Sequence, residues 1–284
     1  MSQAASGPAE PEPGADAGSP RELDPPPGWL DRAHELALGL ADLADDMALS
    51  RFGSSVPAET KPDGSPVTEV DRMVESALRQ RIAAVFPEHA FLGEETGGTL
   101  DHNRPTWVID PIDGTKNFMR GVPVFACLIG VVWHGHGVLG VASAPAMGER
   151  WDAAHGRGAR RNGQPVHVSA VRRLADASVL HGALEWYRDP ALWRVLEHLA
   201  DHAWTTRGFG DFWMHLLVAG GMADAAFETG LKPWDIAALQ AIVCEAGGSL
   251  TAFDGGDALA GADGAVLTTN GLLHAELSAL LAAG

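Results

Sequence analysis

Carboxylates gather in three short motifs of this sequence. Asp110 and Asp113 lie three residues apart within residues 107–115 (WVIDPIDGT), where an apolar run gives way to a Gly-Thr pair. Glu94 follows an apolar pair upstream, and Asp235 follows a tryptophan downstream. Hard cations such as Mg²⁺ take oxygen ligands and often share them with substrate phosphates. The pattern therefore indicates metal-assisted phosphate chemistry.

The central motif could place a metal and a phosphate side by side. We expect Asp110 to end a strand, because the proline that follows it cannot donate to a β-ladder. The chain would then turn, bringing Asp113 beside Asp110 and aiming the Ile112 carbonyl at the same point. Gly114 and Thr115 could open a short helix whose free N–H groups bind phosphate oxygens. The competing interpretation is an ordinary Asp-rich turn.

The other candidate residues also have plain structural interpretations. A glutamate pair at Glu94 could be solvated surface, and Asp235 could simply cap the helix that follows it. Thr68 and Asp71 have the spacing of a capping box. Alternatively, Asp71 orients or deprotonates a water together with the Thr115 hydroxyl. Both roles are compatible, since a cap fixes a carboxylate in place.

Composition narrows the classes of function. The 284 residues are 46% hydrophobic, enough for one large domain or two subdomains. The net charge of −17 argues against nucleic acid as a partner. The two cysteines, Cys127 and Cys244, lie in apolar runs without CxxC spacing, so we expect buried thiols rather than a disulfide. No apolar stretch is long enough to span a membrane and no secretory signal is evident, so a cytoplasmic location is expected.

Residues 1–28 differ from the rest of the chain. They contain seven prolines, four glycines and five acidic residues, with almost nothing apolar. Such a segment cannot bury enough surface to offset its ordering entropy. We expect a flexible tail, with the catalytic domain spanning 29–284.

Hydrophobic periodicity outlines that domain. Helical spacing is found over 36–47 and from Thr68 to about residue 82. Glycine-containing turns suit a hairpin near 135–137 and another turn at 161–164. The pattern predicts an α+β half over about 29–170 and an α/β half over about 171–284, layered together. Strands are expected at 107–110, 124–133, 137–143, 149–154, 178–182, 223–228, 249–252 and 265–268, and further helices at 189–201, 212–220, 235–246 and 271–282.

Together the three motifs resemble those of the inositol monophosphatase superfamily. The resemblance rests on Gly-Glu-Glu at 93–95, Asp-Pro-Ile-Asp-Gly-Thr at 110–115 and Trp-Asp-x-Ala-Ala at 234–238, in this order and spacing. It covers roughly residues 29–284. Members of the superfamily are Mg²⁺-dependent, often lithium-sensitive phosphomonoesterases. Their fold is an αβαβα sandwich of the inositol monophosphatase and fructose-1,6-bisphosphatase type, so we expect that α/β architecture here.

The resemblance implies two or three Mg²⁺ ions in each active site. A first would be held by Glu94, Asp110 and the Ile112 carbonyl, and a second by Asp110, Asp113 and Asp235. A third, weaker metal would lie near Glu94 and water.

The resemblance also implies the remaining catalytic roles. Asp71 and Thr115 match the pair that activates the nucleophilic water, so with Glu94 they form the expected catalytic set. The backbone amides of Gly114 and Thr115 match the phosphate cradle.

The stretch 207–213 (RGFGDFW) bears on the substrate. This stretch, together with 115–118 and 122–124, is similar to the histidinol-phosphatase branch of the superfamily. Histidinol phosphate carries an ammonium and an imidazole, which Asp211 and Glu228 could pair with. Asp211 could instead cap the following helix. Arg207 is a third candidate for substrate binding. It could instead neutralise Asp211 or reach a neighbouring subunit.

We therefore expect hydrolysis of L-histidinol phosphate to L-histidinol and phosphate, a step of histidine biosynthesis. The alternatives are an inositol-1-phosphate or broad-range sugar or nucleotide phosphomonoesterase and, outside catalysis, a scaffold on this fold. The expected partner is a small-molecule phosphomonoester, with no nucleic acid and no membrane. A cytoplasmic homodimer is expected.

Overall fold

The structure is a computed structural model that describes residues 28–54, 57–62, 64–260 and 264–283. Its α-helices are α1 (Trp29–Leu49), α2 (Glu69–Val85), α3 (Thr115–Met119), α4 (Pro190–His202), α5 (Asp211–Ala219), α6 (Pro233–Glu245) and α7 (His274–Ala283). Its strands are β1 (Ala58–Thr60), β2 (Pro66–Thr68), β3 (Ala90–Gly93), β4 (Gly97–Gly98), β5 (Thr106–Asp113), β6 (Ala126–Trp133), β7 (His136–Ala144), β8 (Glu149–Ala154), β9 (Ala159–Arg161), β10 (Gln164–Val166), β11 (Ser178–His181), β12 (Thr205–Gly208), β13 (Ala225–Glu228), β14 (Ser249–Ala252) and β15 (Val266–Thr269).

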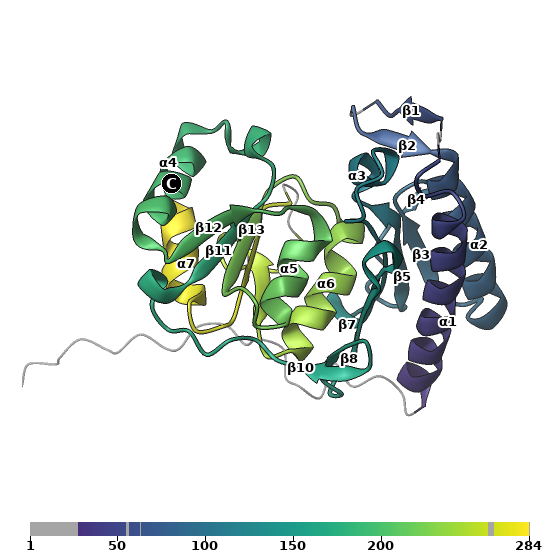
Figure 1. Cartoon of the computed structure of the whole chain (residues 1–284). Helices are drawn as coiled ribbons and strands as arrows, with labels where there is room; N and C mark the ends of the chain where they lie inside the picture. Colours follow the sequence, from purple (N-terminus) through teal and green to yellow (C-terminus); the bar gives the residue numbers. More distant parts are fainter. Residues whose placement is uncertain (1–27, 55–56, 63, 261–263, 284) are drawn as a thin grey trace, which may run out of the picture.

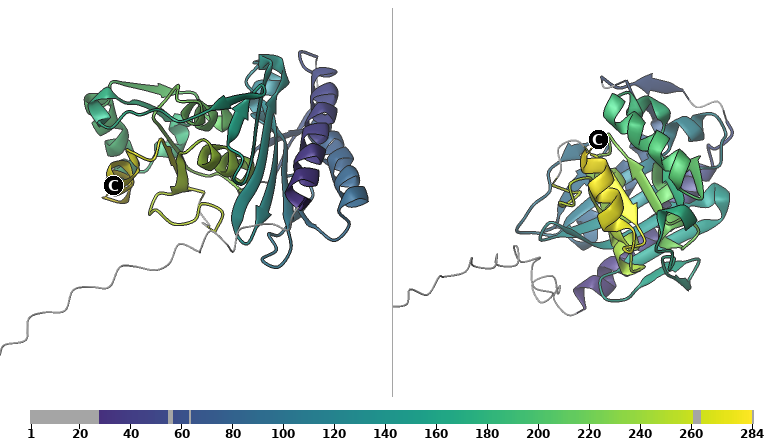
Figure 2. Two further views of the ribbon diagram at one scale, coloured as in Figure 1. Left: turned by 90° about the horizontal axis from the view of Figure 1, so that it is seen from below. Right: turned by 90° about the vertical axis from the view of Figure 1, so that its left-hand side faces the viewer.

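These elements stack in five layers (Figures 1 and 2). The helices α1 and α2 cover one face of a large sheet, and α5 and α6 fill the space between that sheet and a smaller one. The helices α4 and α7 cover the far face of the smaller sheet. The expected αβαβα architecture is confirmed.

The two sheets have different topologies. The large sheet has eight strands in the order β10-β9-β8-β7-β6-β5-β3-β4, antiparallel except where β3 runs parallel to β5. The small sheet has five strands in the order β12-β11-β13-β15-β14, and β11 is parallel to both of its neighbours. The loops that follow β11, β12 and β13 therefore all leave the small sheet at the carboxyl ends of these strands.

Helix α6 lies directly against bare backbone of the large sheet. A Cβ atom added at Gly140 would stand 2.1 Å from the carbonyl oxygen of Ala238, and one at Gly130 would stand 2.8 Å from the Cβ of Ala237. Glycine in the strands and alanine on the helix together permit this approach. The contact fixes the height of α6 above the sheet, and with it the position of Asp235 in the first turn.

Most elements expected from the sequence are present, but the strand expected to end at Asp110 does not end there. Strand β5 continues to Asp113, and its register with β6 shifts between Asp110 and Asp113. An extra residue is thus accommodated as a bulge, which is where a proline is tolerated within a sheet. Strand β12 was not expected, because its residues (TTRG) are polar, partly exposed and without alternation.

The cysteines correct a second expectation. Cys127 is buried on β6, but Cys244 is exposed near the end of α6. An apolar run does not by itself bury every position of a helix, and this one faces outward. Among the described residues, no helix combines the length and the apolar character needed to cross a membrane. The tail expected over 1–28 lies, apart from Gly28, outside the described residues.

Candidate active site

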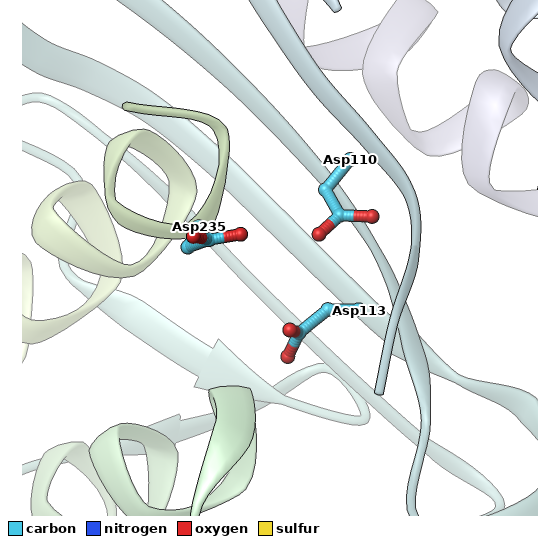
Figure 3. Close-up of side chains that lie close together, drawn as sticks. All are labelled: Asp110, Asp113 and Asp235. Carbon is cyan, nitrogen blue, oxygen red and sulfur yellow. The ribbon is translucent and has the colours of Figure 1, made fainter. Parts of the chain in front are cut away.

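Three aspartates converge where β5 meets the start of α6. Asp110 is buried on β5, Asp113 stands at the end of that strand, and Asp235 lies in the first turn of α6. Each offers a carboxylate oxygen, and the three oxygens lie within 4.8 Å of one another. Figure 3 shows Asp235 reaching from the helix toward the two strand residues. Separate parts of the chain thus supply one cluster of oxygen atoms.

Backbone N–H groups hold these carboxylates in place. The donors are Ile112 N to Asp110 Oδ1 (2.9 Å), Phe212 N to Asp113 Oδ2 (2.7 Å) and Lys232 N to Asp235 Oδ2 (2.7 Å). Asp235 therefore does bond at the start of its own helix, as its plain interpretation expected, while it also faces the cluster. Asp113 serves the first turn of α5 in the same way.

The three aspartates are close to one another and to other carboxylates, so their negative charges repel one another. Desolvation, reinforced by the charges of Glu94 and the other two aspartates, raises the pKa of Asp110 well above its usual range. Desolvation and neighbouring carboxylates do the same for Asp113, and the pKa of Asp235 rises to about 7. A bound cation would relieve this repulsion.

Glu94 is held by a lysine that sequence reasoning missed. Lys61, between β1 and β2, places its Nζ 2.7 Å from Glu94 Oε1 and 2.6 Å from Glu95 Oε1. Burial raises the pKa of Glu94, and the lysine partly opposes that rise. Lys61 lies in a turn-rich stretch that carries no periodic signal, so only the folded chain places it here.

Glu75, which the sequence analysis also did not identify, holds the backbone that follows Glu94. Glu75 is fully buried on α2, and its carboxylate accepts hydrogen bonds from Glu95 N and Thr96 N, both at 2.8 Å. A Cβ at Gly93 would stand 2.4 Å from the Glu75 carboxyl carbon, so a larger residue there would displace this carboxylate. A glutamate on the apolar face of a predicted helix is the signal that could have identified it.

Asp71 and Thr115 also meet. Asp71 completes a capping box with Thr68, whose backbone N–H donates to Asp71 Oδ2 at 2.8 Å. The hydroxyl of Thr115 lies 3.4 Å from Asp71 Oδ1 and donates to the Ile112 carbonyl at 3.0 Å. Burial raises the pKa of Asp71. Gly114, with φ of 83°, precedes the short helix α3, as the central motif suggested.

A cavity of about 450 Å³ opens beside the cluster. Asp71, Asp110 and Ile112 are buried just behind its lining: Asp71 and Ile112 contact Thr115, and Asp110 lies in the cluster with Asp113 and Asp235. The structure therefore brings most of the expected metal, phosphate and substrate residues around one space. Those that line it are Glu94, Asp113, Gly114, Thr115, Asp211, Glu228 and Asp235.

Two further carboxylates lie at the side of this cavity. Asp211 is the first residue of α5, at φ of 51°, and its Oδ2 accepts a hydrogen bond from Asn117 Nδ2 at 3.0 Å. The residue in the N-cap position of this helix is Gly210, not Asp211. Glu228 is buried at the end of β13, and its Oε2 has no hydrogen-bond partner among the described residues. Burial, then the charges of Asp211 and Asp235, raise the pKa of Glu228 to about 8.

Arg207 is not brought into the site. It is exposed on the edge strand β12, and its guanidinium donates to the Thr206 carbonyl at 2.7 Å. Within the described part of the chain it does not line the cavity, and Asp211 bonds to Asn117 instead. An edge position turns this side chain toward solvent, which the sequence pattern does not reveal.

The fold and the comparisons with known proteins define a phosphoric monoester hydrolase. The chain belongs to the inositol monophosphatase family, whose profile matches residues 29–283.

Relatives with established names support this assignment. The chain is 46% identical over 256 residues to a histidinol-phosphatase of Mycobacterium tuberculosis, covering 88% of this chain and 97% of that protein. It is 40% identical to a histidinol-phosphatase of Streptomyces coelicolor, with the same two coverages. Among solved structures, the IMPase of Thermotoga maritima superposes with a TM-score of 0.79 at 30% identity, over 89% of this chain and 97% of that one.

Proposed function

We propose that this protein hydrolyses L-histidinol phosphate to L-histidinol and inorganic phosphate, as a step of histidine biosynthesis. The observation that carries the proposal is the similarity to histidinol-phosphatases over nearly their full length. The acidic side of the cavity agrees with it, because Asp211 and Glu228 suit a substrate with an ammonium and an imidazole.

The donor set fits Mg²⁺. Carboxylate oxygens are the ligands this ion prefers, and a cation among the three aspartates would offset the desolvation and mutual repulsion that raise their pKa values. Asp110, Asp113 and Asp235 would hold one ion, and Glu94, Asp110 and the Ile112 carbonyl another. When bound, Mg²⁺ polarises the phosphoryl oxygens, lowers the pKa of a coordinated water and stabilises the leaving alkoxide.

The residues beside the cluster would prepare the water. The Thr115 hydroxyl oxygen lies 3.0 Å from the Ile112 carbonyl oxygen and 3.4 Å from Asp71 Oδ1, so its proton can be directed to either, and the same oxygen can accept a hydrogen bond from a water in the cavity. Asp71 lies behind this hydroxyl, and burial raises its pKa, which makes it a better proton acceptor than an exposed aspartate. With the Thr115 hydroxyl turned to Asp71, the proton of the water would pass to the Thr115 oxygen as the hydroxyl proton passes to the Asp71 carboxylate.

The phosphate and the rest of the substrate would occupy different ends of the cavity. The amides of Gly114 and Thr115, next to the aspartate cluster, would receive the phosphoryl oxygens. Asp211 would take the ammonium, and the unpartnered oxygen of Glu228 would take a further N–H donor. Positioning of this kind supplies most of the acceleration in phosphoryl transfer.

A phosphate-release assay tests the proposal. Histidinol phosphate, inositol 1-phosphate and a 3′-phosphonucleotide are compared on the purified protein, with a chelator and with added Mg²⁺. We expect the highest kcat/KM on histidinol phosphate, loss of activity on chelation and recovery with Mg²⁺. Inositol 1-phosphate is the second candidate, since the chain is also 36% identical over 265 residues to the inositol-1-monophosphatase of Synechocystis. Turnover of histidinol phosphate in rigorously metal-free protein would contradict the mechanism.

We also propose that the protein acts as a cytoplasmic homodimer. This rests on the superfamily resemblance, and sedimentation of the purified protein tests the oligomeric state.

A further inference from the structure

Three loops at the carboxyl ends of β11, β12 and β13 lie beside the carboxylates that line the cavity. Strand β11 is parallel to both β12 and β13, so the segments that follow these strands leave the sheet side by side. They bring Trp186, Phe209 and Gly230 to the lining of the same cavity. Trp186 and Phe209 are 49% and 42% exposed, so their rings are open to whatever enters. Exposed aromatic side chains gathered beside a polar cavity are typical of ligand-binding sites.

Trp186 is held in place by its neighbours. The residue after it, Tyr187, is fully buried, and its hydroxyl donates to the Phe227 carbonyl at 2.7 Å while accepting from Gly182 N at 3.1 Å. These bonds tie the segment Leu184–Tyr187 to β13 and to the end of β11. The tryptophan therefore emerges from an anchored turn rather than from a loose loop.

The indole lies close to the backbone of Gly230, which also lines the cavity. Gly230 has φ of 82°, and a Cβ atom there would stand 3.2 Å from Cζ3 of Trp186. A side chain at this position would be strained and would press on the ring. Glycine at position 230 therefore leaves this part of the indole and of the cavity free of a further side chain.

An acceptor for a polar ring lies close by in the chain. Glu228 stands two residues before Gly230, is 5% exposed, and has one carboxylate oxygen without a partner among the described residues. An unpaired buried acceptor is costly, so a ligand that donates an N–H to it is favoured. An open aromatic face beside such an acceptor suits a planar ring that carries N–H groups and positive charge.

We propose that the exposed indole of Trp186 receives the imidazole ring of the substrate, while the free oxygen of Glu228 accepts an imidazole N–H. Asp211 is then left for the ammonium group. This inference rests on the proposed function and names the specificity residue of the same site. It assigns Trp186 to the recognition of an imidazole-bearing phosphomonoester, in contrast to an uncharged polyol phosphate.

The test compares two substrates that differ in the ring. O-Phosphoethanolamine keeps the phosphate ester and the ammonium on the neighbouring carbon but has no imidazole. We expect Trp186→Ala to lose about 5- to 30-fold in kcat/KM for histidinol phosphate, mostly through KM, as loss of a stacking or cation–π contact implies. The same variant should change less than about twofold on phosphoethanolamine, since that substrate makes no ring contact.

Two more variants separate recognition from structure. Trp186→Phe keeps an aromatic face and should retain a large part of the activity that alanine removes. Trp204→Ala removes a tryptophan that is 73% exposed and does not line the cavity, and should match the parent. Inhibition by L-histidinol is measured in each variant and should weaken in step with kcat/KM.

The outcomes distinguish this inference from the proposed function. An active parent whose Trp186→Ala variant loses equally on both substrates, or on neither, overturns the role of Trp186 and leaves the proposed function intact. A parent without activity on histidinol phosphate overturns the proposed function itself, and the imidazole subsite with it.

Discussion

Replacing Asp235 by asparagine should stabilise the metal-free protein while abolishing most activity. The pKa of this carboxyl rises from 3.8 to about 7, chiefly because the surrounding protein excludes water. Ionising it at pH 8 would cost the fold about 4 kcal/mol at 1.36 kcal/mol per pKa unit, and screening at this partly exposed group lowers that to about 2–4 kcal/mol. Asparagine carries no charge and keeps an oxygen for the Lys232 N–H, so little is lost in exchange.

The pH dependence of this gain has a definite sign. Because the folded-state pKa is raised, the carboxyl favours the fold when protonated, and its contribution to stability falls as pH rises from about 4 through about 7. The advantage of Asp235→Asn should therefore be close to zero near pH 4 and full at pH 8.

Urea unfolding in the presence of a chelator, followed by circular dichroism at pH 5 and pH 8, measures this difference. Asp201→Asn, an exposed aspartate on α4, is the control and should leave stability unchanged. With Mg²⁺ present the order should reverse, because the parent gains binding energy that the variant has lost. A variant less stable than the metal-free parent at pH 8, or a difference that does not vary with pH, would refute the reasoning.

Three further predictions concern residues around the site and the N-terminal segment. Glu75→Gln should raise the Mg²⁺ concentration for half-maximal activity by about tenfold and reduce the thermal stabilisation by Mg²⁺, because an amide cannot accept both N–H bonds from the Glu95 segment; an unchanged metal requirement would count against it. Asp211→Asn should lose about 10- to 100-fold in kcat/KM for histidinol phosphate and far less for inositol 1-phosphate, as loss of a charge-assisted bond implies; equal losses would assign it to loop support. Deleting residues 1–26, outside the described residues, should leave Tm and turnover nearly unchanged, whereas a large drop would show that the segment docks on the body.

The elements that the sequence predicted well are those whose signal is local. Buried strands such as β6 and β7 are long apolar runs, and the turns at His134 and Asn162 sit at Asn-Gly or His-Gly pairs with positive φ. The short strands β1, β4 and β12 are exposed or glycine-rich, so they form because a neighbour offers a ladder. The partner of β12 is β11, which lies beyond an intervening helix in the sequence, whereas β1 and β4 pair with the adjacent strands β2 and β3. In none of the three does a periodic hydrophobic pattern predict the strand.

The same distinction applies to the site. The motif around Asp110 brings its carboxylates together through its own bulge, so spacing alone could indicate a cluster. Glu75 and Lys61 act on the Glu94 segment from 20 and 33 residues away, respectively. The position of Glu75 on the apolar face of a predicted helix marks it as unusual without showing its partner, and nothing in the local sequence of Lys61 marks a role. The ring of Trp186 lies against Gly230, a residue that follows another strand of the small sheet. Contacts of this kind become visible only when the sheets are assembled.

The bare backbone under α6 makes the metal site sensitive to residues that carry no chemistry. A methyl group at Gly140 would collide with the Ala238 carbonyl, and the helix would have to rise to admit it. Asp235 is rigidly joined to that helix, whereas Asp110 and Asp113 belong to the sheet. The distance from Asp235 to Asp110 and Asp113 is therefore set by direct backbone contact between the helix and the sheet, with no side chain between them. In a screen of random substitutions, changes at Gly140 would reduce activity as changes at a metal ligand do, although Gly140 contributes no donor atom. A side chain at Gly140 would also move the carboxylates apart and so favour a larger cation.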